Sequence, residues 1–194
     1  MNRIGLFGGS FDPVHIGHLI TASYVMTERR LEKIVFIPSF LSPFKVMTGH
    51  SDASHRMNML RLAIDDFPGF EIDDIELQRM GVSFTIDTIN EYHKVYDKVD
   101  LIIGYDNLTS FDKWKDPESI VEKADLVVLP RKWGQNQEPL EESRFARYVT
   151  YSSSPVIQIS STMIREKVKR GESIRFLTPP AVEDYIYTNN LFKV

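Results

Sequence analysis

The sequence combines a glycine turn with a pair of histidines in one short stretch, Gly8-Gly9-Ser10-Phe11-Asp12-Pro13-Val14-His15-Ile16-Gly17-His18. The apolar run from Ile4 to Phe7 before it is typical of a β-strand, and glycines after a strand let the backbone approach a ligand. Asp12 followed by Pro13 is typical of a helix start, because aspartate caps helices and proline fits the first helical position. The stretch therefore predicts a strand, a tight turn and a helix in succession.

The two histidines, His15 and His18, share one face of the predicted helix and lie in its first turns. Free backbone N–H groups and the positive end of the helix dipole favour an anion at that place. A histidine at a helix start often only caps or packs. Two of them beside a glycine turn favour a phosphate site instead.

The composition bounds the class of protein. A chain of 194 residues that is 42% hydrophobic predicts one domain over residues 1–194, with a C-terminal helical segment from about residue 160 packed on it. The net charge of -4 does not indicate binding to the negatively charged backbone of a nucleic acid. No apolar run approaches the roughly 18 residues of a membrane span, so we expect a soluble cytoplasmic protein without a membrane partner. The absence of cysteine excludes disulfides and thiolate chemistry.

Strand-like and helical patterns alternate along the chain. This alternation predicts an α/β fold with a Rossmann-like, doubly wound, mostly parallel sheet and helices on both faces. Ligands bind such sheets outside the carboxyl ends of the strands. The strands are expected at residues 4–7, 34–38, 70–77, 99–104, 126–130 and 155–159. The helices are expected at residues 15–30, 54–66, 85–96, 108–114 with 117–123, 161–170 and 180–190.

A second signature lies near the far end of the chain, Ile159-Ser160-Ser161-Thr162-Met163-Ile164-Arg165. Its hydroxyl residues are helix N-cap types that offer hydroxyls and free amides to a phosphate. Arg165 follows one turn later, where a guanidinium could pair with phosphate oxygens. A capped helix with a solvated basic face is the plain alternative, and we accept it for Lys167, Lys169 and Arg170.

The two signatures together resemble the nucleotidyltransferase superfamily, and the chain is similar to the bacterial nicotinate-nucleotide adenylyltransferases. The likeness extends in order through segments 38–45, 55–57, 83–88 and 103–108 to Trp114. Ser10 stands where the family often has threonine, and Phe44 stands where many members have histidine. The resemblance implies transfer of the adenylyl group of ATP to nicotinate mononucleotide, which gives nicotinate adenine dinucleotide and pyrophosphate.

The resemblance also implies roles for particular residues. It implies catalytic roles for His15, His18, Lys45 and Arg165, and nicotinate mononucleotide binding by Thr85 and Trp114. For ATP it implies Gly8, Gly9, Ser10, Phe11, Gly104, Asp106, Arg131, Ile159, Ser160, Ser161 and Thr162. Mg²⁺ is expected to be held mainly by ATP phosphates, so no metal-ligating residue is predicted. The nucleophilic phosphate is already anionic, so direct in-line attack needs no covalent enzyme intermediate.

Several alternatives remain open from the sequence. The acceptor could be nicotinamide mononucleotide or phosphopantetheine, and the chain could be a nucleotide-binding module without turnover. A class I aminoacyl-tRNA synthetase fragment also carries His-Ile-Gly-His, but this chain lacks Lys-Met-Ser-Lys-Ser and a basic surface. The predicted partners are ATP and nicotinate mononucleotide, with a homo-oligomer left open. His50, His55 and His93 are interpreted as structural or surface residues.

Overall fold

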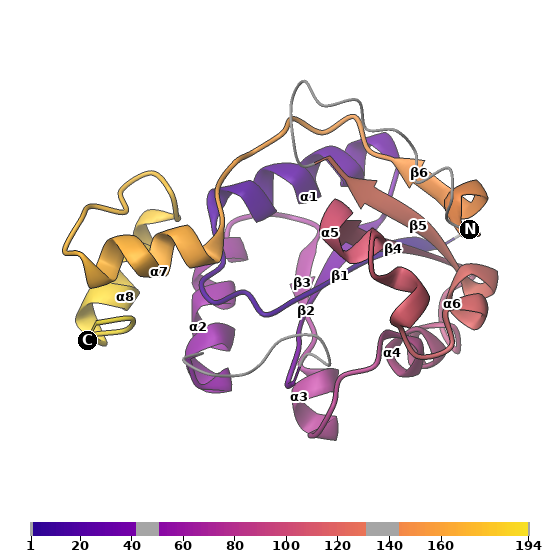
Figure 1. Ribbon diagram of the computed structural model, residues 1–194, viewed down its shortest axis with the longest axis horizontal. Helices are drawn as coiled ribbons and strands as arrows, with labels where there is room; N and C mark the ends of the chain where they lie inside the picture. The colour runs from indigo at the N-terminus through magenta and orange to yellow at the C-terminus, as the bar shows by residue number, and fades with distance from the viewer. Residues whose placement is uncertain (1, 42–50, 131–143, 194) are drawn as a thin grey trace.

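The computed structural model describes residues 2–41, 51–130 and 144–193. Its centre is a six-stranded sheet with strand order β3-β2-β1-β4-β5-β6, in which every neighbouring pair is parallel (Figure 1). This confirms the predicted α/β fold. The strands are β1 (Arg3–Gly9), β2 (Lys33–Pro38), β3 (Phe70–Ile72), β4 (Lys98–Gly104), β5 (Ala124–Leu129) and β6 (Val149–Tyr151).

Helices cover both faces of the sheet, because successive strand residues point to opposite sides. Phe7, Phe36 and Ile102 belong to one buried cluster with side chains of α1, α2, α7 and α8. Leu6, Leu101 and other residues of alternate register pack on the other face with α4, α5 and α6. The helices are α1 (Ile16–Glu28), α2 (Ala53–Ile64), α3 (Ile75–Arg79), α4 (Thr85–Tyr92), α5 (Tyr105–Leu108), α6 (Pro117–Lys123), α7 (Ser161–Lys169) and α8 (Pro180–Thr188), with short 3₁₀ turns η1 (Phe111–Lys113) and η2 (Ala146–Tyr148).

The C-terminal helices α7 and α8 lie beyond α1 and α2, at one end of the molecule (Figure 1). Ile164, Val168, Val182 and Ile186 are buried in the same cluster as the sheet residues on the α1 face. Burying these apolar side chains stabilises the docking of the helices on the sheet. The described part of the chain contains no helix long and apolar enough to span a membrane.

Two predicted strands were wrong in part or in whole. The expected strand 70–77 ends at Ile72, because the Asp73 side chain accepts a hydrogen bond from the Ile75 amide at 2.9 Å and turns the chain into α3. The expected strand 155–159 is absent, and the sixth strand is β6 at 149–151. Beyond it, the Glu28 carboxylate accepts the Ser153 amide at 3.1 Å, which takes that amide out of sheet pairing.

Two helix predictions also needed correction. The predicted helix 108–114 is divided between α5, which ends at Leu108, and η1, which begins at Phe111. The first helix begins at Ile16 rather than at Pro13, with His15 as its N-cap residue in extended backbone (φ -144°, ψ 167°). The carbonyls of Asp12 and Pro13 accept hydrogen bonds from α7 side chains, so they are not part of a helical ladder.

A network of charges joins the amino ends of β1, β4 and β5. Asp100 is fully buried, and its carboxylate accepts hydrogen bonds from Arg3 Nε at 2.7 Å and Arg29 Nε at 2.6 Å. Both arginines also reach Asp125, which is more than half exposed. Each oxygen of the buried carboxylate therefore has a cationic donor, which is the condition under which a buried charge is tolerated.

Candidate active site

Two cavities open at the carboxyl edge of the sheet and share a wall. A large cavity of about 590 Å³ lies toward α1 and α7, and a small cavity of about 320 Å³ lies toward α3 and α4. Both volumes fit the range of small-molecule sites. The shared wall consists of Gly8, Gly9 and Ser10, at the end of β1, and Asp106 and Asn107, in α5 directly after β4. Molecules bound in the two cavities would therefore meet over the glycine turn.

The glycines at these strand ends leave room for a ligand. A Cβ atom at Gly8 or at Gly104 would meet no atom within 4 Å, so each backbone borders open space. Phe11 turns its side chain into the core, where it is 1% exposed and lies edge-on to Phe7 with the ring centroids 5.7 Å apart. The turn thus presents backbone to the cavities and puts its aromatic ring into the core.

The histidine pair stands on the wall of the large cavity with its rings stacked, the centroids 3.6 Å apart. The backbone N–H of His15 donates to Nδ1 of His18 at 3.2 Å. Because Nδ1 of His18 accepts this bond, the ring proton of neutral His18 is on Nε2, which is then the donor atom of the ring. The predicted placement of both histidines on one side of the helix start is confirmed.

His15 is a buried, uncharged imidazole. Burial lowers its pKa to about 4, and a backbone hydrogen bond opposes that effect. Its Nδ1 atom is buried and makes no hydrogen bond in the described part of the chain. Gly17 makes room for the ring, since a Cβ there would lie 3.0 Å from Nδ1 of His15. His15 is therefore a neutral donor near neutral pH, not a cation.

Helix α7 joins the second signature to the first. The Ser160 hydroxyl accepts a hydrogen bond from the Met163 amide at 3.1 Å, which confirms the predicted cap. Ser161 Oγ donates to the Pro13 carbonyl at 2.8 Å, and Arg165 donates to the Asp12 carbonyl at 2.7 Å. The residues of this helix start that were predicted to bind ATP all line the large cavity: Ile159, Ser160, Ser161 and Thr162, followed by Arg165.

Asp12 has a different place from the predicted helix cap. Its side chain is fully buried, and Oδ2 accepts the Ser51 amide at 3.1 Å. The buried Arg56 guanidinium donates to the Ser10 carbonyl at 2.9 Å, and burial lowers the pKa of Arg56 while the nearby Asp12 charge raises it. Arg56 thus holds the backbone of the glycine turn in place through the Ser10 carbonyl. The only signal for this role in the sequence was the likeness of the segment His55-Arg56-Met57.

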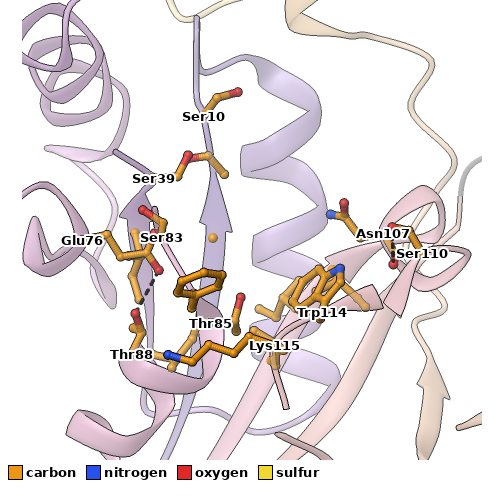
Figure 2. A pocket seen from close by; sticks show the side chains of 18 of the residues that line it. Ser10, Ser39, Glu76, Ser83, Thr85, Thr88, Asn107, Ser110, Trp114 and Lys115 are labelled. Carbon is orange, nitrogen blue, oxygen red and sulfur yellow. Dashed lines mark hydrogen bonds between the residues drawn. The ribbon is translucent and has the colours of Figure 1, made fainter. Parts of the chain in front are cut away.

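The small cavity has an aromatic side and a polar side. Figure 2 shows Trp114, Asn107 and Ser110 facing Glu76, Ser83 and Thr88 across it. The indole of Trp114 packs on the Phe111 ring with the centroids 5.2 Å apart. Thr85, the first residue of α4, brings a helix N-terminus to the cavity. Lys115 also lines the cavity, and its Nζ lies 3.0 Å from an Asp87 oxygen. Thr85 and Trp114, predicted separately from distant segments, border the same space.

Sequence reasoning missed part of this lining. Glu76 fell in the supposed strand 70–77, and no role was given to Ser83, Thr88 or Lys115. Lys115 directly follows Trp114, and that adjacency was the available signal. His55 is structural as predicted, since its Nδ1 lies 2.9 Å from the Tyr185 hydroxyl. The predicted site residues Lys45 and Arg131, as well as Phe44, lie outside the described residues.

Comparison with known proteins gives the class first. Residues 6–167 match the cytidylyltransferase-like family model. A parallel sheet with a histidine pair after a glycine turn and a capped helix facing it has the features of a nucleotidyltransferase. Among solved structures, a Plasmodium falciparum nicotinic acid mononucleotide adenylyltransferase complexed with NaAD shares the fold, with a TM-score of 0.78 at 20% identity over 99% of this chain and 98% of that chain.

Sequence relatives give the particular family. A probable nicotinate-nucleotide adenylyltransferase from Caldicellulosiruptor bescii is 40% identical over 98% of this chain and 99% of its own length. The Clostridium tetani protein of the same name is 37% identical over 100% of both chains. The chain belongs to the nicotinate-nucleotide adenylyltransferases.

Proposed function

We propose that the protein transfers the adenylyl group of ATP to nicotinate mononucleotide, forming nicotinate adenine dinucleotide and pyrophosphate in NAD biosynthesis. The observation that carries this proposal is the pair of cavities with a common wall at the glycine turn. A reaction that joins two nucleotides through their phosphates needs two sites that meet at one point. The chemistry of each lining assigns the two substrates.

The large cavity suits ATP. Its wall combines the histidine pair with the start of α7, where helix amides and the dipole favour phosphate oxygens. Arg165 uses two of its nitrogens on the Asp12 carbonyl and on Thr162 Oγ1, and a guanidinium has five N–H donors in all. We assign its other donors to the β- and γ-phosphates, and Asp106 to a ribose hydroxyl.

The small cavity suits the pyridine nucleotide. Trp114 offers an aromatic face on which a pyridine ring can stack. The start of α4 at Thr85 offers backbone amides to the nicotinate carboxylate, which is the part that an amide analogue lacks. The phosphate group of the pyridine nucleotide would then point toward the shared wall at Gly8–Ser10.

The chemistry is direct in-line displacement at the α-phosphorus of ATP. The attacking phosphate oxygen is already anionic, so the low pKa of His15 is no obstacle, because no general base is required. His18 would donate from Nε2 to the α-phosphate as charge develops, and His15 would orient a phosphate as a neutral donor. Catalysis then consists of positioning two charged substrates and stabilising the transition state.

Mg²⁺ belongs to the same proposal, and when bound with ATP it neutralises phosphate charge. No group of three or more His, Asp or Glu side chains in the described ranges is arranged to hold a metal ion. We expect the ion to be held mainly by phosphate oxygens and water, as Mg²⁺ commonly is in phosphate-binding sites. The proposed catalytic role of Lys45, the proposed ATP contact of Arg131, the cytoplasmic location and a homo-oligomer stay predictions.

The decisive experiment is an acceptor panel. Pyrophosphate release is measured with ATP and Mg²⁺ plus nicotinate mononucleotide, nicotinamide mononucleotide or phosphopantetheine in turn. We expect the highest kcat/KM for nicotinate mononucleotide. A strong preference for phosphopantetheine, or release with none of the three, would overturn the proposal.

A further inference from the structure

A buried carboxyl group stands on the polar side of the small cavity without a role in the reaction. Glu76 is 8% exposed, and in helix α3 it is the buried member. Burial raises the pKa of its carboxyl, while hydrogen bonds from Thr88 and Ser83 and the charge of Arg79 oppose that effect. Burying a carboxyl group costs free energy of folding unless the group is hydrogen-bonded.

Its partner is Thr88, one helical turn beyond Thr85 in α4. Thr88 is 2% exposed, and its hydroxyl donates to Oε1 of Glu76 at 2.9 Å, the bond drawn in Figure 2. The same hydroxyl oxygen accepts a hydrogen bond from the Arg79 guanidinium. The Thr88 hydroxyl is thus held by both a donor and an acceptor from α3, which fixes the first turn of α4 on its neighbour.

We propose that Glu76, acting through Thr88, is a positioning residue that sets the affinity of the small cavity for the pyridine nucleotide. The inference rests on the proposed function, in which the start of α4 receives the nicotinate carboxylate. A helix end recognises a carboxylate only when its amides point at the right place. The hydrogen bonds that join Thr88 to Glu76 and Arg79 of α3 fix the direction of these amides from one helical turn away.

The fold supplies a matched control on the same two elements. The Tyr92 hydroxyl donates to Oδ2 of Asp73 at 2.6 Å, and this bond also joins α4 to the start of α3. Tyr92 is the last residue of α4, and it is absent from the lining of the small cavity. Removing its hydroxyl therefore loosens the same pair of elements at the end far from the proposed carboxylate site.

The test is steady-state kinetics with both substrates varied, on the full chain, with melting temperatures measured beside it. Thr88→Val keeps the side-chain shape and removes the hydroxyl. We expect it to raise KM for nicotinate mononucleotide about tenfold, with kcat and KM for ATP within about twofold of wild type. Thr88→Ser should restore that KM to within about threefold, and Tyr92→Phe should leave it unchanged.

A double-mutant cycle then assigns the effect to Glu76. Glu76→Ala should raise the same KM to a similar extent, and the Glu76→Ala/Thr88→Val pair should raise it no further than the larger single change. Additive effects, equal shifts in both KM values, or an equal effect of Tyr92→Phe would overturn the inference. If Glu76→Ala does not fold, Glu76→Gln replaces it in the cycle, and its coupling to Thr88→Val decides the assignment. Wild-type protein that makes no nicotinate adenine dinucleotide would instead count against the proposed function.

Discussion

The two ends of the sheet are built from the same strands but differ in how their buried polar groups are hydrogen-bonded. At the amino end, the buried Asp100 carboxylate has an arginine donor on each oxygen. At the carboxyl end, Nδ1 of His15, on the wall of the large cavity, is buried and makes no hydrogen bond in the described part of the chain. The strands β1 and β4 contribute to both ends. Satisfied polar groups stabilise a fold, whereas unsatisfied ones at a cavity are available to a ligand.

The amino end of the sheet contributes mainly to stability, and the carboxyl end carries the groups that face the proposed substrates. The charge network at the amino end joins three strands and α1 without bordering either cavity. At the carboxyl end, Gly8 and Gly104 border open space and the histidine pair lines the large cavity. Substitutions at the two ends should therefore separate stability from activity.

The largest expected effect is on activity, at His18. His18→Ala removes a donor that we assign to the transition state, so kcat should fall about a hundredfold to a thousandfold. The melting temperature should fall by only about 2–4 °C, because the ring lies on a cavity wall and its loss removes the hydrogen bond from the His15 amide. Single-turnover product formation and thermal unfolding measure the two quantities. A folded variant with near-normal kcat would refute the assigned role.

The matching change at the amino end is Asp100→Ala, and its effect should be on stability. It leaves Arg3 and Arg29 without their buried partner, which should lower the free energy of unfolding by about 3 kcal/mol. The kcat of the folded fraction should stay near wild type. Denaturant unfolding measures the loss. Asp125→Asn is the control, because Asp125 is 57% exposed and should cost less than about 1 kcal/mol.

Within the carboxyl end, Trp114 tests whether the two cavities bind different substrates. Trp114→Ala should raise KM for nicotinate mononucleotide roughly tenfold to thirtyfold, because stacking on a ring is worth about 1–3 kcal/mol. KM for ATP should remain within about twofold. Trp114→Phe keeps an aromatic face and should recover much of the affinity. Equal changes in both Michaelis constants would contradict stacking in the small cavity.

Most of the fold followed from local pattern. The strand predicted at 99–104 is β4, and the hydroxyl residues at 160–162 predicted the start of α7. The errors arose where a side chain or a distant element took over backbone groups. Asp73 turned the chain into α3, and α7 took the carbonyls of Asp12 and Pro13 from a longer first helix. Such long-range partners leave no periodic signal.

The candidate site likewise contains residues that local motifs predicted and residues that only the structure revealed. His15, His18, Thr85 and Trp114 were predicted from motifs, and each borders one of the two cavities. Their roles in the reaction stay proposals. Glu76 could not be found, because its place depends on a short helix that the apolar pattern of 70–77 concealed. The neutral state of His15 also needed the structure, since burial sets it.

The smallest expected effect is a pH dependence of stability from His15. Its pKa is about 4 in the folded protein, below the ordinary 6.5, so the unfolded chain binds a proton first as the pH falls. Folding should therefore lose just under 2 kcal/mol through this group between pH 7 and pH 5, and regain it as the pH rises. Urea unfolding at both pH values, for wild type and His15→Asn, isolates the contribution. The variant should show the smaller acid-induced loss. Equal losses in wild type and His15→Asn would mean that His15 is not the buried neutral group at the carboxyl end.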